Sequence, residues 1–312
     1  MTLEFRGTIC RVLGDGSTGV VILYNDTAIK LPKSVFGGAN DDDDDDRKVI
    51  EWEKEVYRRL DNCEGVISCI DLSGDGIKMA WMENGNLRDY LAEHNVPLPM
   101  RLSWLRHLAH TLAAIHDRRV IEADLSPRNI LVAKDMSVKF SDFTESSLLP
   151  LDCDMETVDD NGYSMQTDIG QFGALMYEVS TGVRCTFDLF ENQPLGPATT
   201  ALPKRDSLPP TEGVWLGAII ESAGSSTQSA PVVNCQKFWT WFRTLSPTTI
   251  PTRRLGLTEW IEAGFVVSRS ILTFQRFPDD HEETFESQHQ KTFVTKIGPV
   301  SMSILDTGAN VI

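Results

Sequence analysis

The chain has 312 residues, of which 41% are hydrophobic, and a net charge of −16. This length is enough for about two domains of ~150 residues, and the negative charge argues against nucleic acids and anionic membranes as partners, because their phosphates would repel it. With no apolar run of ~18–20 residues, no secretory pattern at the N-terminus and scattered cysteines, we expect an intracellular, cytoplasmic protein without a membrane span.

The first 81 residues are expected to form a small β-rich unit. Short runs rich in β-branched and aromatic residues predict strands, and a helix is predicted from Arg47, where apolar residues recur every three or four positions. The strands are expected at residues 10–13, 20–24, 27–31, 66–70 and 76–81.

Beyond residue 81 the pattern becomes helical. Helices are predicted at residues 87–93, 98–117 and 168–181, and another begins at Trp215. After about residue 222 no sustained periodicity is visible, although the aromatic cluster at residues 239–242 could pack on a core. We therefore expect three parts, at residues 1–81, 82–221 and 222–312.

The acidic run at residues 41–46 lies between the third strand and the first helix. It could attract cations, but it lacks the alternating oxygen ligands, central glycine and terminal glutamate of a calcium loop. A run of like charges is usually solvated and disordered, and we expect that here.

The segment at residues 122–132 carries the clearest chemical signal. Asp124 and Asn129 stand five positions apart before an apolar run, and Asp142 follows 13 positions after Asn129. Such a set suits phosphoryl transfer, in which one carboxylate orients a hydroxyl while the amide and the second carboxylate hold magnesium and a nucleoside triphosphate.

A glycine-rich turn lies between the first two predicted strands and contains Gly14, Gly16 and Gly19, followed by Val21. A dinucleotide-binding motif would need a helix after the third glycine. The glycines could let the backbone lie over phosphates, or they could form a simple hairpin turn. Lys30, flanked by apolar residues on the next strand, favours the phosphate interpretation.

A buried lysine needs a counter-charge, and the helix after the acidic run offers two. Glu53 is the expected partner of Lys30, because Trp52 and Val56 mark the inward face beside it. Glu55 is the second choice, and a fully exposed acidic helix face is the remaining alternative.

Together, these motifs make residues 10–221 resemble the eukaryotic protein kinase family, and they occur along the chain in the same order as in that family. A divergent fungal group of kinase-like proteins is similar in four segments. They are residues 53–57, 84–87, 143–147 and 208–216. The resemblance implies an α+β, two-lobed protein kinase-like fold with a small β-rich N-lobe and a mainly helical C-lobe.

The resemblance also implies site roles, with ATP and Mg²⁺ as cofactors and a protein as substrate. Asp124, Lys30 and Glu53 would be catalytic, while Asn129 and Asp142 would bind the metal. ATP would be bound by Gly14, Gly16, Gly19, Val21, Ala28, Lys30, Ala80, Met82 and Leu131. Asp168 matches the buried aspartate that braces the catalytic loop, although it could equally be the N-cap of the apolar helix.

Several positions depart from the family pattern. The family's His-Arg pair before the catalytic aspartate is Glu122-Ala123, the loop lysine is Ser126, and the glycine after Asp142-Phe143 is Thr144. Losing the arginine removes the usual clamp for a phosphorylated activation loop. Because every metal, phosphate and base position is kept, we expect an active protein kinase. The catalytic loop does not resemble a tyrosine-specific one, so Ser or Thr is the expected acceptor, although Ser126 weakens this preference. A pseudokinase and a small-molecule phosphotransferase remain the alternatives.

Overall fold

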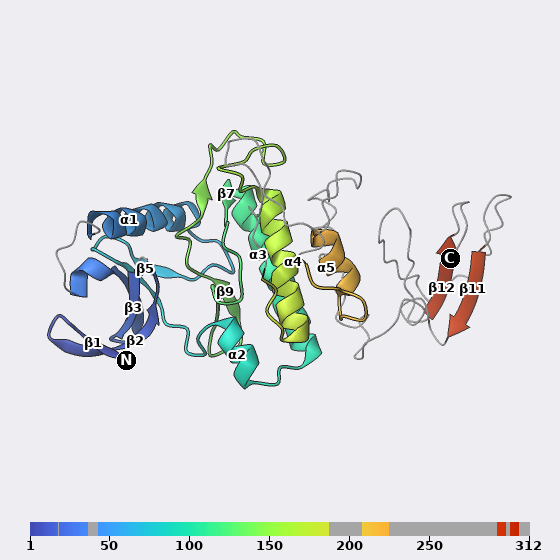
Figure 1. Cartoon of the computed structure of the whole chain (residues 1–312), viewed down its shortest axis with the longest axis horizontal. Coiled ribbons are helices and arrows are strands. Elements are labelled where there is room, and N and C mark those ends of the chain that lie inside the picture. Colours follow the sequence, from blue (N-terminus) through green and yellow to red (C-terminus); the bar gives the residue numbers. More distant parts are fainter. Residues whose placement is uncertain (18, 37–42, 187–207, 225–291, 298–299, 306–312) are drawn as a thin grey trace.

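The computed structural model describes residues 1–17, 19–36, 43–186, 208–224, 292–297 and 300–305. A twisted sheet with one helix lies at one end, and a group of helices lies beside it (Figure 1). The aromatic cluster at residues 239–242 falls outside the described residues. No helix in the described part of the chain has the length and apolar character needed to cross a membrane. The three predicted domain limits stay predictions.

The sheet has six antiparallel strands in the order β1-β2-β3-β4-β6-β5. They are β1 (Thr2–Phe5), β2 (Thr8–Asp15), β3 (Gly19–Tyr24), β4 (Thr27–Pro32), β6 (Ile77–Ala80) and β5 (Cys69–Asp71). The sequence did not predict β1, whose four residues are too few for a clear pattern and which is held by pairing with β2. The turn between β3 and β4 was predicted, and Asn25 and Asp26 have the positive φ of a tight hairpin, 47° and 58°.

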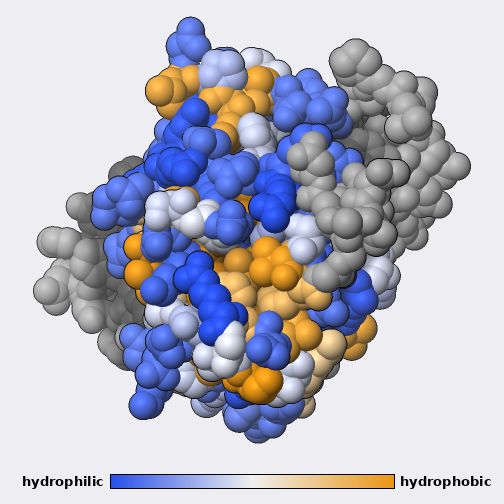
Figure 2. Space-filling model, turned by 90° about the vertical axis from the view of Figure 1, so that its left-hand side faces the viewer, coloured by the Kyte–Doolittle hydropathy of each residue, from blue (hydrophilic) through white to orange (hydrophobic). Residues whose placement is uncertain are grey.

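Two apolar clusters hold the sheet in place. One joins the sheet to the helices, and the smaller one is built on Cys10, Val20, Ile22 and Leu31, with partly buried side chains such as Phe5 around it. Figure 2 looks at the end of the molecule that holds the sheet and shows hydrophobic residues set among hydrophilic ones.

Helix α1 (Asp43–Arg59) begins earlier than predicted, inside the acidic run. The expectation that the whole run is disordered is therefore wrong for residues 43–46. Carboxylates in the first turn of a helix interact favourably with its dipole, and Asp45 also pairs with Lys48 at 3.0 Å. The first two aspartates of the run lie outside the described residues.

The inward face of α1 differs in part from the prediction. Val56 is fully buried, but the Trp52 side chain is 40% exposed and lies at the edge of the helix. The predicted strand at residues 66–70 is also shorter, because Val66 and Ile67 leave the sheet. The amide of Ile67 donates to the carbonyl of Phe140 at 2.9 Å, which joins this end of the sheet to the helical part.

The helical part contains α2 (Leu87–Glu93), α3 (Leu98–Asp117), α4 (Met165–Thr181) and α5 (Gly217–Gly224). Helices α2 and α3 have the predicted limits. Helix α4 starts three residues earlier than predicted, because Ser164 and Thr167 form a capping box at its N-terminus. Helix α5 packs on α4, and Trp215, just before it, is in the main core.

Four short strands lie between α3 and α4 and position the segment that carries the chemical signal. They form two antiparallel pairs, β7 (Val120–Ile121) with β10 (Ser147–Leu148), and β8 (Ile130–Val132) with β9 (Val138–Phe140). A further hairpin, β11 (Thr292–Ile297) with β12 (Val300–Leu305), was not predicted, because the C-terminal sequence shows no sustained periodicity.

Candidate functional site

Two connected pockets lie between the sheet and the helical part, and the predicted site residues line them. The first has a volume of about 590 Å³, within the usual range for small-molecule sites. Its lining includes Gly14, Val21, Ala28, Lys30, Glu53, Ala80, Met82, Leu131 and Asp142. The second is wider and adds Gly16, Gly19 and Asp124, while Asn129 lines both. The structure thus brings every predicted site residue to one region.

The glycine-rich turn lies between β2 and β3, as predicted, and its glycines line the pockets. Gly19 is required by the fold, because a Cβ there would lie 2.8 Å from the carbonyl oxygen of Leu31. At Gly14 the nearest atoms would be 3.9 Å away, so folding alone does not demand glycine. The absence of a side chain at Gly14 leaves room for a ligand to approach the backbone.

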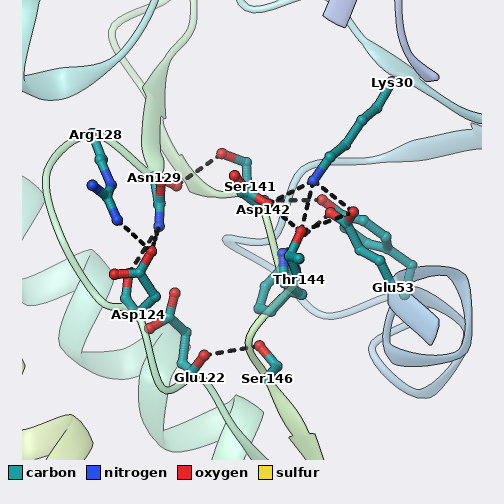
Figure 3. A network of polar contacts seen from close by, with 12 residues as sticks. Lys30, Glu53, Glu122, Asp124, Arg128, Asn129, Ser141, Asp142, Thr144 and Ser146 are labelled. Carbon is teal, nitrogen blue, oxygen red and sulfur yellow. Dashed lines mark hydrogen bonds and ion pairs between the residues drawn. The ribbon is translucent and has the colours of Figure 1, made fainter. Parts of the chain in front are cut away.

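Lys30, on β4, is the centre of a buried charge network (Figure 3). Its Nζ lies 2.7 Å from Oε2 of Glu53, on α1, and 2.6 Å from Oδ1 of Asp142. The predicted Lys30–Glu53 pair is therefore confirmed. The second choice, Glu55, is wrong, since Glu55 is exposed and pairs with Arg58 at 2.6 Å.

The pKa values in this network follow from burial and from opposite charge. Burial by itself lowers the pKa of Lys30, but the carboxylates of Glu53 and Asp142 outweigh it and raise the pKa, so the ammonium is kept. Burial raises the pKa of Glu53 more than Lys30 lowers it. Burial also acts to raise the pKa of Asp142, but Lys30 and Thr144 lower it overall, which favours the carboxylate.

Asp142 has a left-handed backbone, with φ of 63°, which is costly for a residue other than glycine. Its neighbours fix this conformation. The amide of Asp142 donates to the hydroxyl of Tyr57 at 3.3 Å, and the amide of Phe143 donates to Oε1 of Glu53 at 3.2 Å. The buried ring of Phe143 packs edge-on against Tyr57, with centroids 5.2 Å apart. Helix α1 therefore sets the orientation of Asp142.

The loop before β8 holds Asp124 beside Asn129. The side-chain nitrogen Nδ2 of Asn129 donates to Oδ2 of Asp124 at 2.9 Å, and the guanidinium of Arg128 donates to the same oxygen at 2.7 Å (Figure 3). The carbonyl of Asn129 accepts bonds from the amide and the hydroxyl of Ser141, which precedes Asp142. Asn129 is thus bonded to Asp124 directly and to Ser141, the neighbour of Asp142. Arg128 was not among the predicted site residues, although its i, i+4 spacing from Asp124 indicates such a pair.

Asp168 supports this loop from below. It is fully buried, and its carboxylate accepts bonds from the amides of Glu122 and Ala123, both at 2.9 Å, and contacts His116 at 2.7 Å. The bracing interpretation is confirmed. The N-cap alternative is wrong, because Ser164 caps α4.

Glu122 occupies the position of the family's histidine and is an unusual buried acid. Its side chain is 1% exposed, and neither carboxyl oxygen makes a hydrogen bond of standard geometry within the described part of the chain. Burial raises the pKa of Glu122 well above its ordinary value, and the nearby carboxylates of Asp168, Asp124 and Asp142 raise it further. These effects favour the protonated, uncharged form of the Glu122 side chain.

Comparison with known proteins shows the family. Residues 9–199 match the family described as protein tyrosine and serine/threonine kinase, which is more than half of the chain, and the chain belongs to the protein kinase family. It is 28% identical over 177 residues to the tyrosine-protein kinase JAK3 of Rattus norvegicus, covering 50% of this chain and 15% of that protein.

Two mouse proteins are similar as well. Tyrosine-protein kinase TXK of Mus musculus is 30% identical over 195 residues, which is 56% of this chain and 36% of that protein. Cytoplasmic tyrosine-protein kinase BMX of Mus musculus is 28% identical over 206 residues, which is 59% of this chain and 31% of that protein. The chain thus spans 36% or less of the length of these three relatives.

Proposed function

We propose that this chain is an ATP- and magnesium-dependent protein kinase that transfers the γ-phosphate to a hydroxyl group of a protein. The convergence of Lys30, Asp142 and the Asp124–Asn129 pair on one cleft carries this proposal. These groups come from three separate parts of the chain, and their convergence has no evident role in the packing of the core.

The side chains divide the work according to their charge and position. Lys30, kept charged by Glu53, would bind phosphate oxygens at the end of the first pocket. Asp124 would orient the substrate hydroxyl and accept its proton. Magnesium, when bound, would neutralise charge on the phosphates. The glycine hairpin would exclude water above them.

The residues present suit a magnesium–nucleotide complex. Magnesium prefers oxygen ligands, takes few from the protein, and shares substrate phosphates. The carboxylate of Asp142 and the amide oxygen of Asn129 are such ligands, since the amide nitrogen already donates to Asp124. No group of three or more His, Cys, Asp or Glu among the described residues could hold a metal alone. A cation here would therefore depend on the nucleotide.

Two features point to different acceptor hydroxyls. The catalytic loop favours Ser and Thr, whereas the relatives are named tyrosine kinases. Incubating the purified chain with peptide pools that contain only Ser, only Thr or only Tyr as acceptors, and measuring the phosphate incorporated, decides between them. Labelling confined to the Tyr pool would overturn the Ser/Thr preference. Membership of a divergent fungal group also stays a prediction.

The central test is transfer of labelled γ-phosphate by the wild-type chain, Asp124→Asn and Lys30→Met. We expect both substitutions to reduce transfer by at least ~10² because they remove the base or the phosphate contact. Lys33→Met is a matched control, since Lys33 is an exposed lysine that pairs with Asp15 at 3.3 Å. Equal turnover in the wild-type chain and Lys30→Met would contradict the assignment.

A pseudokinase is the second candidate, and one observation favours it. Oδ2 of Asp124 already accepts bonds from Arg128 and Asn129, so this oxygen of the base is occupied. Nucleotide binding without measurable transfer in the wild-type chain, in Arg128→Ala and with every peptide pool would support this alternative. Transfer by the wild-type chain would exclude it.

A further inference from the structure

The hydroxyl of Thr144 lies within the charge network around Lys30, at a position where the family has a glycine (Figure 3). Lys30 Nζ donates to Thr144 Oγ1 at 2.8 Å, and Oγ1 lies 2.7 Å from Oδ1 of Asp142. Oε2 of Glu53 is 3.4 Å from the same hydroxyl. The hydroxyl therefore accepts from the cation and donates to the aspartate, with both partners at good hydrogen-bond distance.

The backbone conformation at position 144 does not call for a glycine. Thr144 is not among the described residues with positive φ, so its conformation does not require glycine. Threonine is therefore tolerated here without strain, and its hydroxyl is available for contacts that glycine cannot make.

The Asp142 side chain is less confined by packing than those of Lys30 and Glu53, so a hydrogen bond from the Thr144 hydroxyl has more effect on its orientation. Its side chain is 49% exposed, whereas those of Lys30 and Glu53 are 7% and 0% exposed. A half-exposed carboxylate can adopt several rotamers unless specific bonds hold it. Besides Lys30, the side-chain donor to its Oδ1 is Thr144. The hydroxyl is neutral, so it can orient the carboxylate without adding a positive charge that would repel a metal ion.

We propose that Thr144 is a positioning residue that holds the Asp142 carboxylate in the orientation needed to bind the magnesium of a magnesium–nucleotide complex. The inference rests on the proposed function, because it assigns Asp142 to the metal. It predicts that loss of the hydroxyl weakens the magnesium-dependent part of nucleotide binding and leaves the magnesium-independent part unchanged.

Calorimetric titration with a non-hydrolysable ATP analogue tests this, once with excess Mg²⁺ and once with EDTA. For Thr144→Val we expect the dissociation constant with Mg²⁺ to rise roughly tenfold, as for loss of one hydrogen bond to a charged group. With EDTA we expect less than about a twofold change. Thr144→Ser, which keeps the hydroxyl, should stay within about twofold of the wild-type chain in both conditions.

Thr157→Val is the matched control, because Thr157 is also a threonine whose hydroxyl contacts an aspartate, Asp154, at 3.3 Å, but it lies outside both pockets. It should bind like the wild-type chain. If Thr144→Val does not fold, Thr144→Ala replaces it in the same titrations. Equal Mg²⁺-dependent affinity in the wild-type chain and the hydroxyl-free variant would overturn the inference, and so would equal losses with Mg²⁺ and with EDTA. No binding by the wild-type chain would instead count against the proposed function.

Discussion

The indole nitrogen of Trp52 donates a hydrogen bond to the main-chain carbonyl of Ser146 at 2.9 Å, across 94 positions of sequence. This bond ties the outer edge of α1 to the segment that follows Asp142. Farther along the helix, Arg59 donates to the carbonyl of Leu149 at 3.1 Å. Together with the Glu53–Phe143 bond, these contacts hold α1 against the segment that follows Asp142.

Replacing Trp52 by Phe should keep most of the ring packing and remove the bond to Ser146. We expect the free energy of unfolding to fall by about 1 kcal/mol, the usual net value of one hydrogen bond. Urea unfolding followed by circular dichroism measures this change. An unchanged midpoint would show that the bond adds nothing to stability.

Replacing Glu53 by Gln should leave the Lys30 ammonium buried with Asp142 as its remaining carboxylate partner. We expect a loss of about 2 kcal/mol in unfolding free energy, less than for a fully unpaired buried charge, and a clear loss of nucleotide binding. Glu55→Gln is the matched control, because the Glu55 side chain is 58% exposed. It should change stability by no more than about 0.5 kcal/mol. Equal effects of the two substitutions would contradict the buried pair.

Asp168→Asn should weaken the brace under the catalytic loop. The amide keeps the size of the side chain but loses the charge and one acceptor position, while the amides of Glu122 and Ala123 and the ring of His116 remain directed at it. We expect a loss of about 2–4 kcal/mol in thermal or urea unfolding. Asp75→Asn, at an exposed aspartate that is 3.7 Å from Arg47, should be nearly neutral.

Glu122 should make stability depend on pH. Its pKa is raised in the folded protein, so the native state holds a proton that the unfolded chain releases above the ordinary value of 4.5. The contribution of Glu122 to the free energy of unfolding is therefore fully present below pH 4.5. It falls as the pH rises from there towards the raised pKa, by at most about 1.4 kcal/mol per pH unit.

Glu122→Gln cannot lose this proton, so its unfolding free energy relative to the wild-type chain should increase as the pH rises from about 5 to about 8. Melting temperatures of the two proteins across this range provide the measurement. Glu55→Gln, at an exposed glutamate, should show no such trend. Parallel curves for the wild-type chain and Glu122→Gln would mean that Glu122 is already ionised in the folded state.

Much of the fold could be predicted from local sequence. The limits of α2 and α3 followed from apolar spacing, and the β3–β4 hairpin followed from Asn25-Asp26. Elements whose stability comes from partners distant in sequence were harder to predict. Strand β1 pairs with β2, and α1 starts within a run of like charges that is typical of disorder.

The sequence by itself determined which chemical groups are present and in what order, because motif spacing and side-chain type are local properties of the chain. Only the tertiary structure decided which groups meet. It chose Glu53 over Glu55, placed Arg128 on Asp124, and put the Thr144 hydroxyl between Lys30 and Asp142. Such choices depend on the rotation of α1 and the path of the segment after β9, which the packing of the whole molecule sets.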